Sequence, residues 1–342
     1  MRRVIAERSL SETAVNEESA LGLYRELVRV RRFDERALSL QRRGGMSSYP
    51  SYRGQGASQV GAASALTAED WLFPTYRSNA LQIARGVPMS DVLLFRRGHP
   101  EFSSDHNLPV FPQAVPIATQ LPHAVGAGMA AAYRGADHAV LAYLGDGATS
   151  EGDFHEAMNF AGVFDAPVVF FCENNGWAIS TPRERQTASA TLAQKARAYG
   201  FEGVRVDGMD PIAVRRTVAD ALGDAREGTP VFVESLTNRQ GAHTTSDDPS
   251  RYRHRGPELP DWRTADPLER FETYLREAGV LDDELIATVE AETERELDRA
   301  VERAEAVPDP DPEELFEPVF AEVTAPLAEQ RRQLRSREID DR

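Results

Sequence analysis

The sequence predicts an α/β protein with a doubly wound parallel sheet flanked by helices and a helical C-terminal extension. The main observation is three short apolar runs, over residues 139–144, 167–172 and 230–235. Helical stretches over residues 151–164, 188–199 and 211–226 lie between or before them. Such alternation of buried strands with helices is typical of parallel βαβ units. The length of 342 residues fits one large α/β unit or two modest domains.

The first element along the chain is expected to be a helix from Ser19 to Arg43. Its apolar residues recur three or four positions apart and make one stripe. Gly44 and Gly45 are expected to end it. Residues 46–58, rich in Gly, Ser and Tyr, read as a loop, and residues 59–66 as a short packed helix. We expect residues 1–18 to form a flexible N-terminal arm.

Residues 119–133 are dense in Ala and Gly and are expected to form a closely packed helix. Within it, Gly126, Gly128 and Ala131 match the dinucleotide-binding fingerprint G-x-G-x-x-A. That fingerprint requires a strand immediately before it. Residues 116–122 are instead polar and interrupted by proline. Tight helix packing is therefore preferred, and an NAD-dependent dehydrogenase remains a rival interpretation.

The C-terminal third predicts a long loop followed by helices. Residues 239–257 lack periodicity, and loops of that length in compact domains are often functional. Residues 266–306 read as polar helices, and prolines at positions 308, 310 and 312 then break the chain. An amphipathic helix is expected over residues 315–323. The expected domains are thus the arm 1–18, an α/β domain 19–265 and a helical region 266–342.

The composition is strongly acidic, with 55 acidic against 39 basic residues and a net charge of −16. This argues against nucleic-acid binding, because neutralising phosphates requires a basic surface. Every basic residue except Lys195 is arginine. The balance fits a salt-rich cytoplasm such as a halophile's, although codon bias towards arginine would produce the same counts.

Neither a membrane span nor a disulfide is expected. No run of 18 apolar residues exists, which is the length that a spanning helix needs. Cys172 is the single cysteine and lies in an apolar run, so we expect a buried, inert thiol. Both observations fit a protein of the reducing cytoplasm.

Polar residues follow two of the predicted strands where each ends. Asp146 lies between two glycines, and Asn175 ends the next strand, 175 − 146 = 29 residues later. Adjacent parallel strands would bring both to one edge, where ligands of open α/β sheets bind. An Asp oxygen, an Asn oxygen and a backbone carbonyl suit Mg²⁺. Gly147 and Ala148 leave backbone N–H groups bare at a helix start, where phosphate binds. These residues alone therefore predict a Mg²⁺–diphosphate site.

The Gly-Asp-Gly and Asn-Asn pattern resembles the thiamine-diphosphate motif. The whole string from Gly145 to Thr181 is similar to the alpha subunit of the first, decarboxylating component of 2-oxo acid dehydrogenase complexes. Segments 24–36, 73–77, 118–126 and 243–248 resemble the same family, so the likeness covers about residues 20–330. It implies the thiamine-diphosphate-binding fold.

The resemblance implies a cofactor role for particular residues. Asp146, Asn175 and the main-chain oxygen of Trp177 would hold Mg²⁺, while Gly147 and Ala148 would contact the diphosphate.

Other matching positions come from outside these two strand ends. Tyr76 and Arg77 would reach the cofactor, Arg77 as a bidentate phosphate clamp. Ile117 would support the bent conformation of thiamine. His243 would lie beside the reactive carbon and act as general acid or base or orient the intermediate.

A potassium site is also implied. Thr119 and Gln120, with the main-chain carbonyl of Pro116, match the potassium-binding loop of the branched-chain members.

The implied activity is oxidative decarboxylation of a 2-oxo acid through thiamine diphosphate, with the acyl group passed to a lipoyl arm of an acyltransferase component. In this family a glutamate of the beta subunit completes the site. We therefore expect an alpha–beta heterotetramer, in the cytoplasm, without membrane or nucleic-acid partners, and a chain that is inactive alone. A cofactor-free scaffold subunit is the second rival interpretation.

The substrate is indicated by three departures within the family. After Tyr76 and Arg77 the chain lacks the histidine that is common in pyruvate-type relatives. Residues 308–320 look more like the branched-chain type. Glu173 points the other way, because branched-chain enzymes place an arginine there. A branched-chain 2-oxo acid is favoured, and pyruvate or acetoin stays an alternative.

Overall fold

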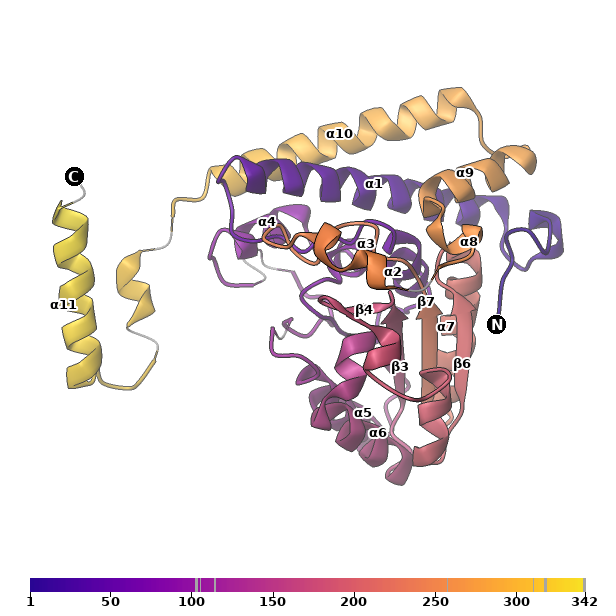
Figure 1. Ribbon diagram of the computed structural model, residues 1–342, viewed down its shortest axis with the longest axis horizontal. Coiled ribbons are helices and arrows are strands. Elements are labelled where there is room, and N and C mark those ends of the chain that lie inside the picture. The colour runs from indigo at the N-terminus through magenta and orange to yellow at the C-terminus, as the bar shows by residue number, and fades with distance from the viewer. Residues whose placement is uncertain are drawn as a thin grey trace.

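The computed structural model describes residues 1–101, 104, 106–113, 115–256, 258–309, 311–316 and 319–340. Within them, five strands form one sheet in the order β1-β2-β3-β7-β6 (Figure 1). The strands are β1 (Trp71–Phe73), β2 (Val140–Gly145), β3 (Val168–Asn174), β6 (Gly203–Asp207) and β7 (Val231–Leu236). Every pairing in this sheet is parallel, as predicted. Short strands β4 (Trp177–Ala178) and β5 (Thr181–Pro182) form a separate antiparallel pair.

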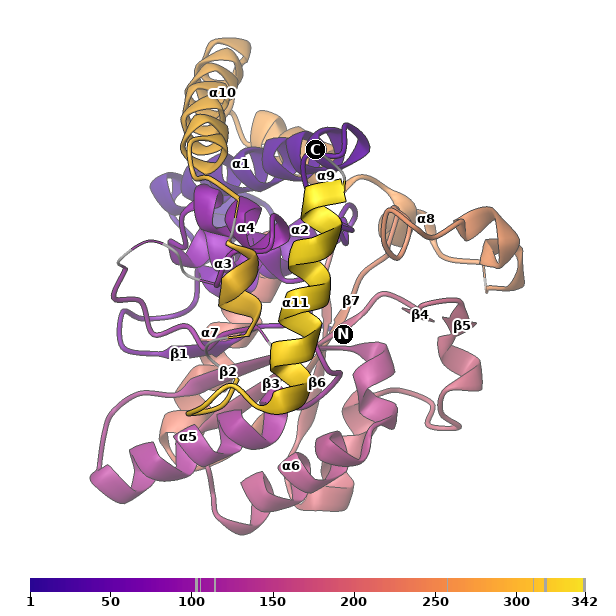
Figure 2. The same ribbon diagram turned by 90° about the vertical axis from the view of Figure 1, so that its left-hand side faces the viewer.

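Helices cover both faces of the sheet, so its central strands β2, β3 and β7 are buried almost from end to end. Leu141 and Phe171 pack on one side with residues of α1 (Glu17–Arg42), α2 (Gly56–Ala63) and α7 (Pro211–Arg226). Val140 and Phe170 pack on the other side with residues of α5 (Gln120–Arg134) and α6 (Gly152–Val163), which lie together in Figure 2. The doubly wound architecture is confirmed.

The remaining helices complete the two ends of the fold. The α-helices are α3 (Asn79–Arg85), α4 (Met89–Arg96), α8 (Asp261–Thr264), α9 (Pro267–Glu277), α10 (Asp283–Glu305) and α11 (Ala325–Asp340). The 3₁₀ helices are η1 (Leu10–Glu12), η2 (Asp146–Ser150), η3 (Arg183–Arg185), η4 (Ala193–Tyr199), η5 (Pro249–Arg251), η6 (Arg253–Arg255) and η7 (Pro312–Leu315). In the described ranges, no helix is both long and apolar enough to span a membrane.

The glycine-rich pattern in α5 serves packing. A Cβ atom added to Gly128 would lie 2.8 Å from the Val168 side chain on β3. The segment before α5 is a loop in which Ala118 has a φ of 68°, not a strand. The helix therefore lacks the strand that a dinucleotide fingerprint requires, and it lies directly on the sheet through its small residues.

The N-terminal segment differs from the flexible arm that we predicted. The main-chain N–H groups of Val4 and Ile5 each donate to Asp210 over 2.7 Å, at the start of α7. Arg2 bridges to Val206 on β6. Val4, Ile5 and Leu10 are buried, so the few apolar residues of this segment are enough to dock it. The division of the chain at residue 265 stays a prediction.

The helical C-terminal extension is present, but the amphipathic helix expected over residues 315–323 is not. The chain leaves η7 at Leu315 and bends over residues 319–322 before α11 begins; residues 310, 317 and 318 lie outside the described ranges. Leu315, Val319 and Phe320 are exposed. Figure 1 shows α11 standing apart from the body. An apolar stripe forms a helix mainly when a surface covers it, and within the described ranges only Phe316 of this stripe is buried.

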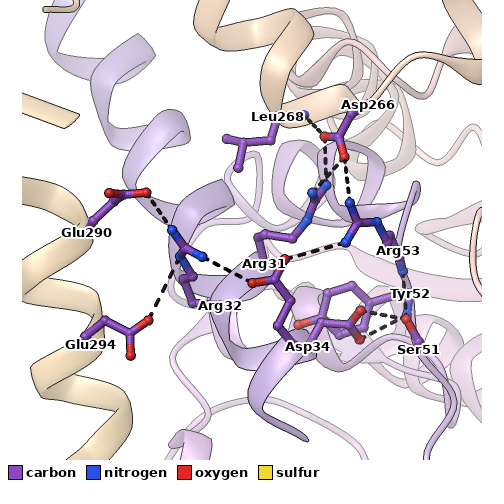
Figure 3. Close-up of polar contacts among 11 residues, drawn as sticks. Arg31, Arg32, Asp34, Ser51, Tyr52, Arg53, Asp266, Leu268, Glu290 and Glu294 are labelled. Atoms are coloured by element: carbon purple, nitrogen blue, oxygen red, sulfur yellow. Dashed lines mark hydrogen bonds and ion pairs between the residues drawn. The ribbon is translucent and has the colours of Figure 1, made fainter. Parts of the chain in front are cut away.

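Helix α10 lies along α1, and the two are joined by ion pairs. Arg25, Arg29, Arg32 and Arg36 of α1 each contact an acidic residue of α10. These pairs are largely exposed, and each contributes about 0–1 kcal/mol. The better shielded pair is Arg31 with Asp266, which joins both guanidinium ends to both carboxylate oxygens over 2.7 and 2.8 Å (Figure 3). Asp266 also accepts from the N–H of Leu268, so this pair fixes the start of α9.

Candidate active site

Two strand ends form the floor of the main pocket. Strands β2 and β3 pair with Gly145 opposite Glu173, so Asp146 and Asn175 emerge at the same edge of the sheet. Asp146 begins η2, and Asn175 lies in a turn completed by Gly176, whose φ of 88° favours glycine. Both residues line one pocket of about 530 Å³.

The pocket gathers side chains from the whole α/β region. Every predicted site residue except Thr119 lines it, namely Tyr76, Arg77, Pro116, Ile117, Gln120, Asp146, Gly147, Ala148, Asn175, Trp177 and His243. An apolar wall of Pro50, Val115 and Ile179 was not predicted. The structure thus brings the candidate residues together, while their individual roles stay predictions.

Oxygen atoms suited to a hard cation converge on the floor. Asp146 is buried; its Oδ2 accepts from Gln186 over 3.3 Å, but its Oδ1 has no hydrogen-bond partner among the described residues. Burial raises the pKa of Asp146 to about 6. The amide of Asn175 donates to Gln55 over 2.8 Å, and its oxygen accepts from the N–H of Trp177 over 3.1 Å. A buried carboxylate oxygen without a partner calls for a ligand.

The donor set fits Mg²⁺ bound together with a diphosphate. In the part of the chain that the structure describes, no group of three or more His, Cys, Asp or Glu side chains could hold a metal. One carboxylate, one amide and a main-chain carbonyl leave an octahedral ion short of ligands. Mg²⁺ commonly takes such missing ligands from substrate phosphates and water.

The walls of the pocket carry positive charge without acidic partners. Arg77 and Arg239 are buried, and neither forms an ion pair with a carboxylate of a described residue. Arg77 donates to the carbonyl of Ser51, and Arg239 to the carbonyl of Ile179 and the hydroxyl of Tyr252. Burial, and then the nearby Arg77, lower the pKa of Arg239. Asp146, Glu151 and Glu173 line the same pocket, but guanidinium groups without a direct ion pair keep donors that an anionic ligand can take up.

The ring of His243 is oriented by these two arginines. Its Nδ1 lies 2.8 Å from Arg77 and 3.3 Å from Arg239. Because a guanidinium only donates, Nδ1 must accept, and the proton of the neutral ring belongs on Nε2. Burial, followed by the charges of Arg77 and Arg239, lowers the pKa of His243 to about 4. The residue is therefore a neutral donor through Nε2 near pH 7.

A buried carboxylate behind the pocket holds Arg77 in place. Asp34 of α1 accepts from the hydroxyl of Ser51 and from the N–H of Tyr52 (Figure 3). It also accepts from the hydroxyl of Tyr49. The carbonyl of Ser51 in turn accepts from Arg77 over 2.7 Å. The loop predicted over residues 46–58 is thus fixed from α1, and it orients the guanidinium that contacts His243.

Two of the four described non-glycine residues with positive φ lie at the rim of the pocket. Ala118 and Ile179 have positive φ values of 68° and 55°, which are uncommon for residues with a side chain, and both line the pocket. A Cβ atom at Gly147 would lie 2.8 Å from that of Ala178, so only glycine allows β4 to approach η2. Such strain is found mainly at functional sites.

The predicted potassium loop lies at the edge of this pocket. The hydroxyl of Thr119 donates to the carbonyl of Pro116 over 2.9 Å, which places two of the three expected oxygens together. Gln120 is buried and donates from its amide to the Tyr143 carbonyl over 2.8 Å.

Four charged residues of the pocket were not among the predicted site residues: Arg96, Glu151, Glu173 and Arg239. Arg239 follows the end of β7 by three residues, so it comes from the same sheet edge that identified Asp146 and could have been found by that rule. Glu173 is buried, and burial raises its pKa to about 7. Arg96 ends α4, whose position beside the pocket is set by tertiary packing and has no signal in the sequence.

Comparison with known proteins gives a consistent result. The family described as dehydrogenase E1 component matches residues 24–313. The 3-methyl-2-oxobutanoate dehydrogenase subunit alpha of Mycobacterium tuberculosis is 44% identical over 322 residues, which cover 94% of this chain and 88% of that protein. The pyruvate dehydrogenase E1 component subunit alpha of Bacillus cereus is 37% identical over 96% of this chain and 88% of its own length. The mitochondrial 2-oxoisovalerate dehydrogenase subunit alpha 2 of Arabidopsis thaliana is 37% identical over 92% and 69%, respectively.

Proposed function

The chain belongs to the dehydrogenase E1 component family, as an alpha subunit of a thiamine-diphosphate-dependent 2-oxo acid dehydrogenase, and we propose that it acts on branched-chain 2-oxo acids. The observation that supports a cofactor site is the buried oxygen of Asp146, which has no partner among the described residues and lies in the pocket that Asn175 also lines. Arg77 and Arg239 line the same pocket and form no ion pair with a carboxylate of a described residue. The acyl group would pass to the lipoyl arm of an acyltransferase component.

The substrate choice is supported by similarity and by the pocket wall. Identity to the relative named for 3-methyl-2-oxobutanoate is 44%, against 37–40% for the relatives named for pyruvate. Val115, Ile117 and Ile179 present branched apolar side chains to the pocket. Burying a branched aliphatic group against them removes apolar area from water, and each buried methylene is worth about 0.8 kcal/mol. Pyruvate lacks that group.

We further propose how the chain holds its cofactor. Asp146, Asn175 and the carbonyl of Trp177 would hold Mg²⁺, and the N–H groups of Gly147 and Ala148 would receive the diphosphate. Arg77 and Tyr76 would contact the cofactor from α3's side, with Ile117 against the thiamine. Pro116, Thr119 and Gln120 would bind K⁺.

The chain's own residues would then prepare the site for chemistry. Thiamine diphosphate, when bound, supplies the nucleophilic carbon and the electron sink for decarboxylation. Arg77 and Arg239 would balance negative charge, and they hold the His243 ring so that Nε2–H is its free donor. His243 would therefore orient or protonate an oxygen of the substrate, a role that a positioned neutral imidazole can fill.

Replacing His243 should separate binding from turnover. We expect His243→Ala to keep the affinity for thiamine diphosphate within about threefold, because the metal and diphosphate contacts are untouched, and to lower turnover by about 10²–10⁴-fold. Calorimetry and CO₂ release on the assembled enzyme measure the two quantities. The matched control is His138→Ala, because His138 precedes β2 at the opposite end of the strand. Undiminished turnover in His243→Ala would remove the proposed role.

A panel of 2-oxo acids tests the substrate proposal. With the beta partner present, 3-methyl-2-oxobutanoate should give a higher kcat/KM for CO₂ release than pyruvate. The reverse order would assign the chain to the pyruvate type, and an assembled enzyme that leaves both acids intact and binds no thiamine diphosphate would indicate a scaffold subunit.

Partners and location complete the proposal. The chain would form an alpha–beta heterotetramer in the cytoplasm, and the acidic, arginine-rich composition would suit a salt-rich one. The single cysteine, Cys172, is buried, and burial raises its pKa well above the ordinary value, which agrees with an inert thiol.

A further inference from the structure

The single lysine of the chain sits next to the proposed metal site. All other basic residues are arginine, yet Lys195 places an ammonium group against the segment that follows Asp146. It lies on η4, and its Nζ donates to the carbonyl of Thr149 over 2.9 Å and to the hydroxyl of the same residue over 3.1 Å. Lys195 is thus attached to η2.

The direction of these hydrogen bonds is fixed by the groups themselves. The carbonyl of Asp146 can only accept, and the Thr149 hydroxyl lies 2.9 Å from it. Thr149 therefore gives its one proton to Asp146 and accepts from the ammonium. Thr149 is almost fully buried. A continuous chain of hydrogen bonds runs from Lys195 through Thr149 to the main chain of the residue expected to bind the metal.

An ammonium group suits this place better than a guanidinium. Its three donors radiate from one atom, so two of them reach the carbonyl and the hydroxyl of one residue, whereas the planar fork of arginine matches paired acceptors. The Nζ atom also lies 5.6 Å from the centre of the buried Phe154 ring. In the described ranges Lys195 makes no ion pair with a carboxylate, so its charge is held by η2 and by the ring.

The main chain of the 3₁₀ helix that carries Lys195 is hydrogen-bonded, through Glu234, to the residue that precedes Asn175. The N–H of Ala193, at the start of η4, donates to the buried Glu234 of β7 over 3.0 Å. The second oxygen of Glu234 accepts from the amide of Asn174 over 2.7 Å. Asn174 immediately precedes Asn175. Lys195 and Glu234 therefore link the segment that carries Asp146 to the turn that carries Asn175.

We propose that Lys195 is a positioning residue that holds η2 in its metal- and diphosphate-binding conformation. The proposal rests on the function proposed above and adds a residue that touches neither metal nor cofactor. The ammonium group holds η2, while the main chain of the same 3₁₀ helix is linked through Glu234 to Asn174.

The test compares cofactor affinity with stability and turnover in the alpha–beta assembly. Lys195→Met keeps an unbranched side chain that is one atom shorter and removes its donors, so the affinity for thiamine diphosphate with Mg²⁺ should fall about tenfold to a hundredfold, as for other supports of metal ligands. At saturating cofactor kcat should stay close to the unaltered value. Lys195→Arg should lie between the two. Arg197→Met is the matched control, because Arg197 lies on the same helix but is exposed and pairs only with Glu202; it should bind normally.

The hydroxyl of Thr149, which connects Lys195 to Asp146, gives an independent test if Lys195→Met does not assemble. Thr149→Ser keeps the hydroxyl and should retain affinity, whereas Thr149→Val keeps the shape without it and should lose affinity. Equal affinity in Lys195→Met and the unaltered enzyme, or in both Thr149 variants, would overturn the proposal. If the unaltered assembly itself binds no thiamine diphosphate, the proposed function fails instead.

Amine chemistry provides a last check on the unaltered protein. An amine-specific acetylating reagent has two targets in this chain, Lys195 and the N-terminal amine. Acetylation should lower cofactor affinity in the unaltered alpha subunit and leave Lys195→Met, which keeps only the terminal amine, at its own value. Loss of affinity in both proteins by the same factor would contradict the assignment to Lys195.

Discussion

Asp146→Ala should abolish measurable binding of thiamine diphosphate to the assembled enzyme. The substitution removes a buried carboxylate oxygen at the sheet edge that lacks a partner in the described residues, and with it the charge that would hold Mg²⁺ and, through Mg²⁺, the diphosphate. Calorimetric titration with thiamine diphosphate and Mg²⁺ measures the loss.

The control for this variant is another buried carboxylate. Asp70 precedes β1 at the opposite edge of the sheet and accepts from the N–H groups of Thr67 and Ala139. Asp70→Asn should destabilise the chain but bind the cofactor with unchanged affinity. Undiminished affinity in Asp146→Ala would remove the metal site from this place in the fold.

The same carboxylate should lower the stability of the chain when no cofactor is bound. Burial raises the pKa of Asp146 from an ordinary value of 3.8 to about 6, so the folded chain disfavours the charged form. Its contribution to stability is therefore greatest below pH 4 and is lost as the pH rises through about 6. Asp146→Asn should raise the free energy of unfolding at pH 7 by up to about 3 kcal/mol, and the difference should vanish towards pH 4. Urea unfolding of the cofactor-free chain at both pH values measures it.

The alpha chain alone should release no CO₂ from 2-oxo acids, and co-expression with its beta partner should restore activity. The relevant feature is the open wall of the pocket: Val115, Ile117 and Ile179 line it and are between 43% and 58% exposed. Apolar side chains grouped at the mouth of a site commonly mark a surface that a partner covers. The family resemblance also implies that a glutamate of the beta subunit completes the reacting centre.

Two measurements check this requirement for a partner. Light scattering should show an alpha–beta heterotetramer when the chains are co-expressed, and CO₂ release should appear only in that assembly. If the alpha chain alone decarboxylates 2-oxo acids at the full rate, the active site does not need the beta subunit and this prediction is wrong.

The sequence predicted the centre of the fold well because buried parallel strands are continuous apolar runs. Strands β2, β3 and β7 each came from such a run, and the edge they share identified Asp146 and Asn175. Strand β1 is only three residues long, and the first three residues of β6 are half-exposed, so neither gave an apolar run. The amphipathic pattern over residues 315–323 was misleading. Periodicity shows that a helix there would have an apolar face, but it does not show that another part of the protein packs against that face.

The residues of the candidate site that follow strand ends could be predicted from the sequence. Those brought to the site by the packing of distant elements could not. Arg77 and His243 are 166 positions apart, and only the family resemblance placed them together. The contacts that support the site were not marked by strand ends or by spacing: Asp34, in the middle of α1, accepts from Ser51, and Lys195 donates to Thr149. Such residues look in the sequence like ordinary surface or core positions.

The most direct measurement is a crystal structure of the alpha–beta assembly with thiamine diphosphate and Mn²⁺ in place of Mg²⁺, in which anomalous scattering locates the metal. One Mn²⁺ ion should be found in direct contact with Asp146, Asn175 and the carbonyl of Trp177, bridging to phosphate oxygens that rest on the N–H groups of Gly147 and Ala148. A metal bound elsewhere, or a diphosphate seated away from these two strand ends, would contradict the account.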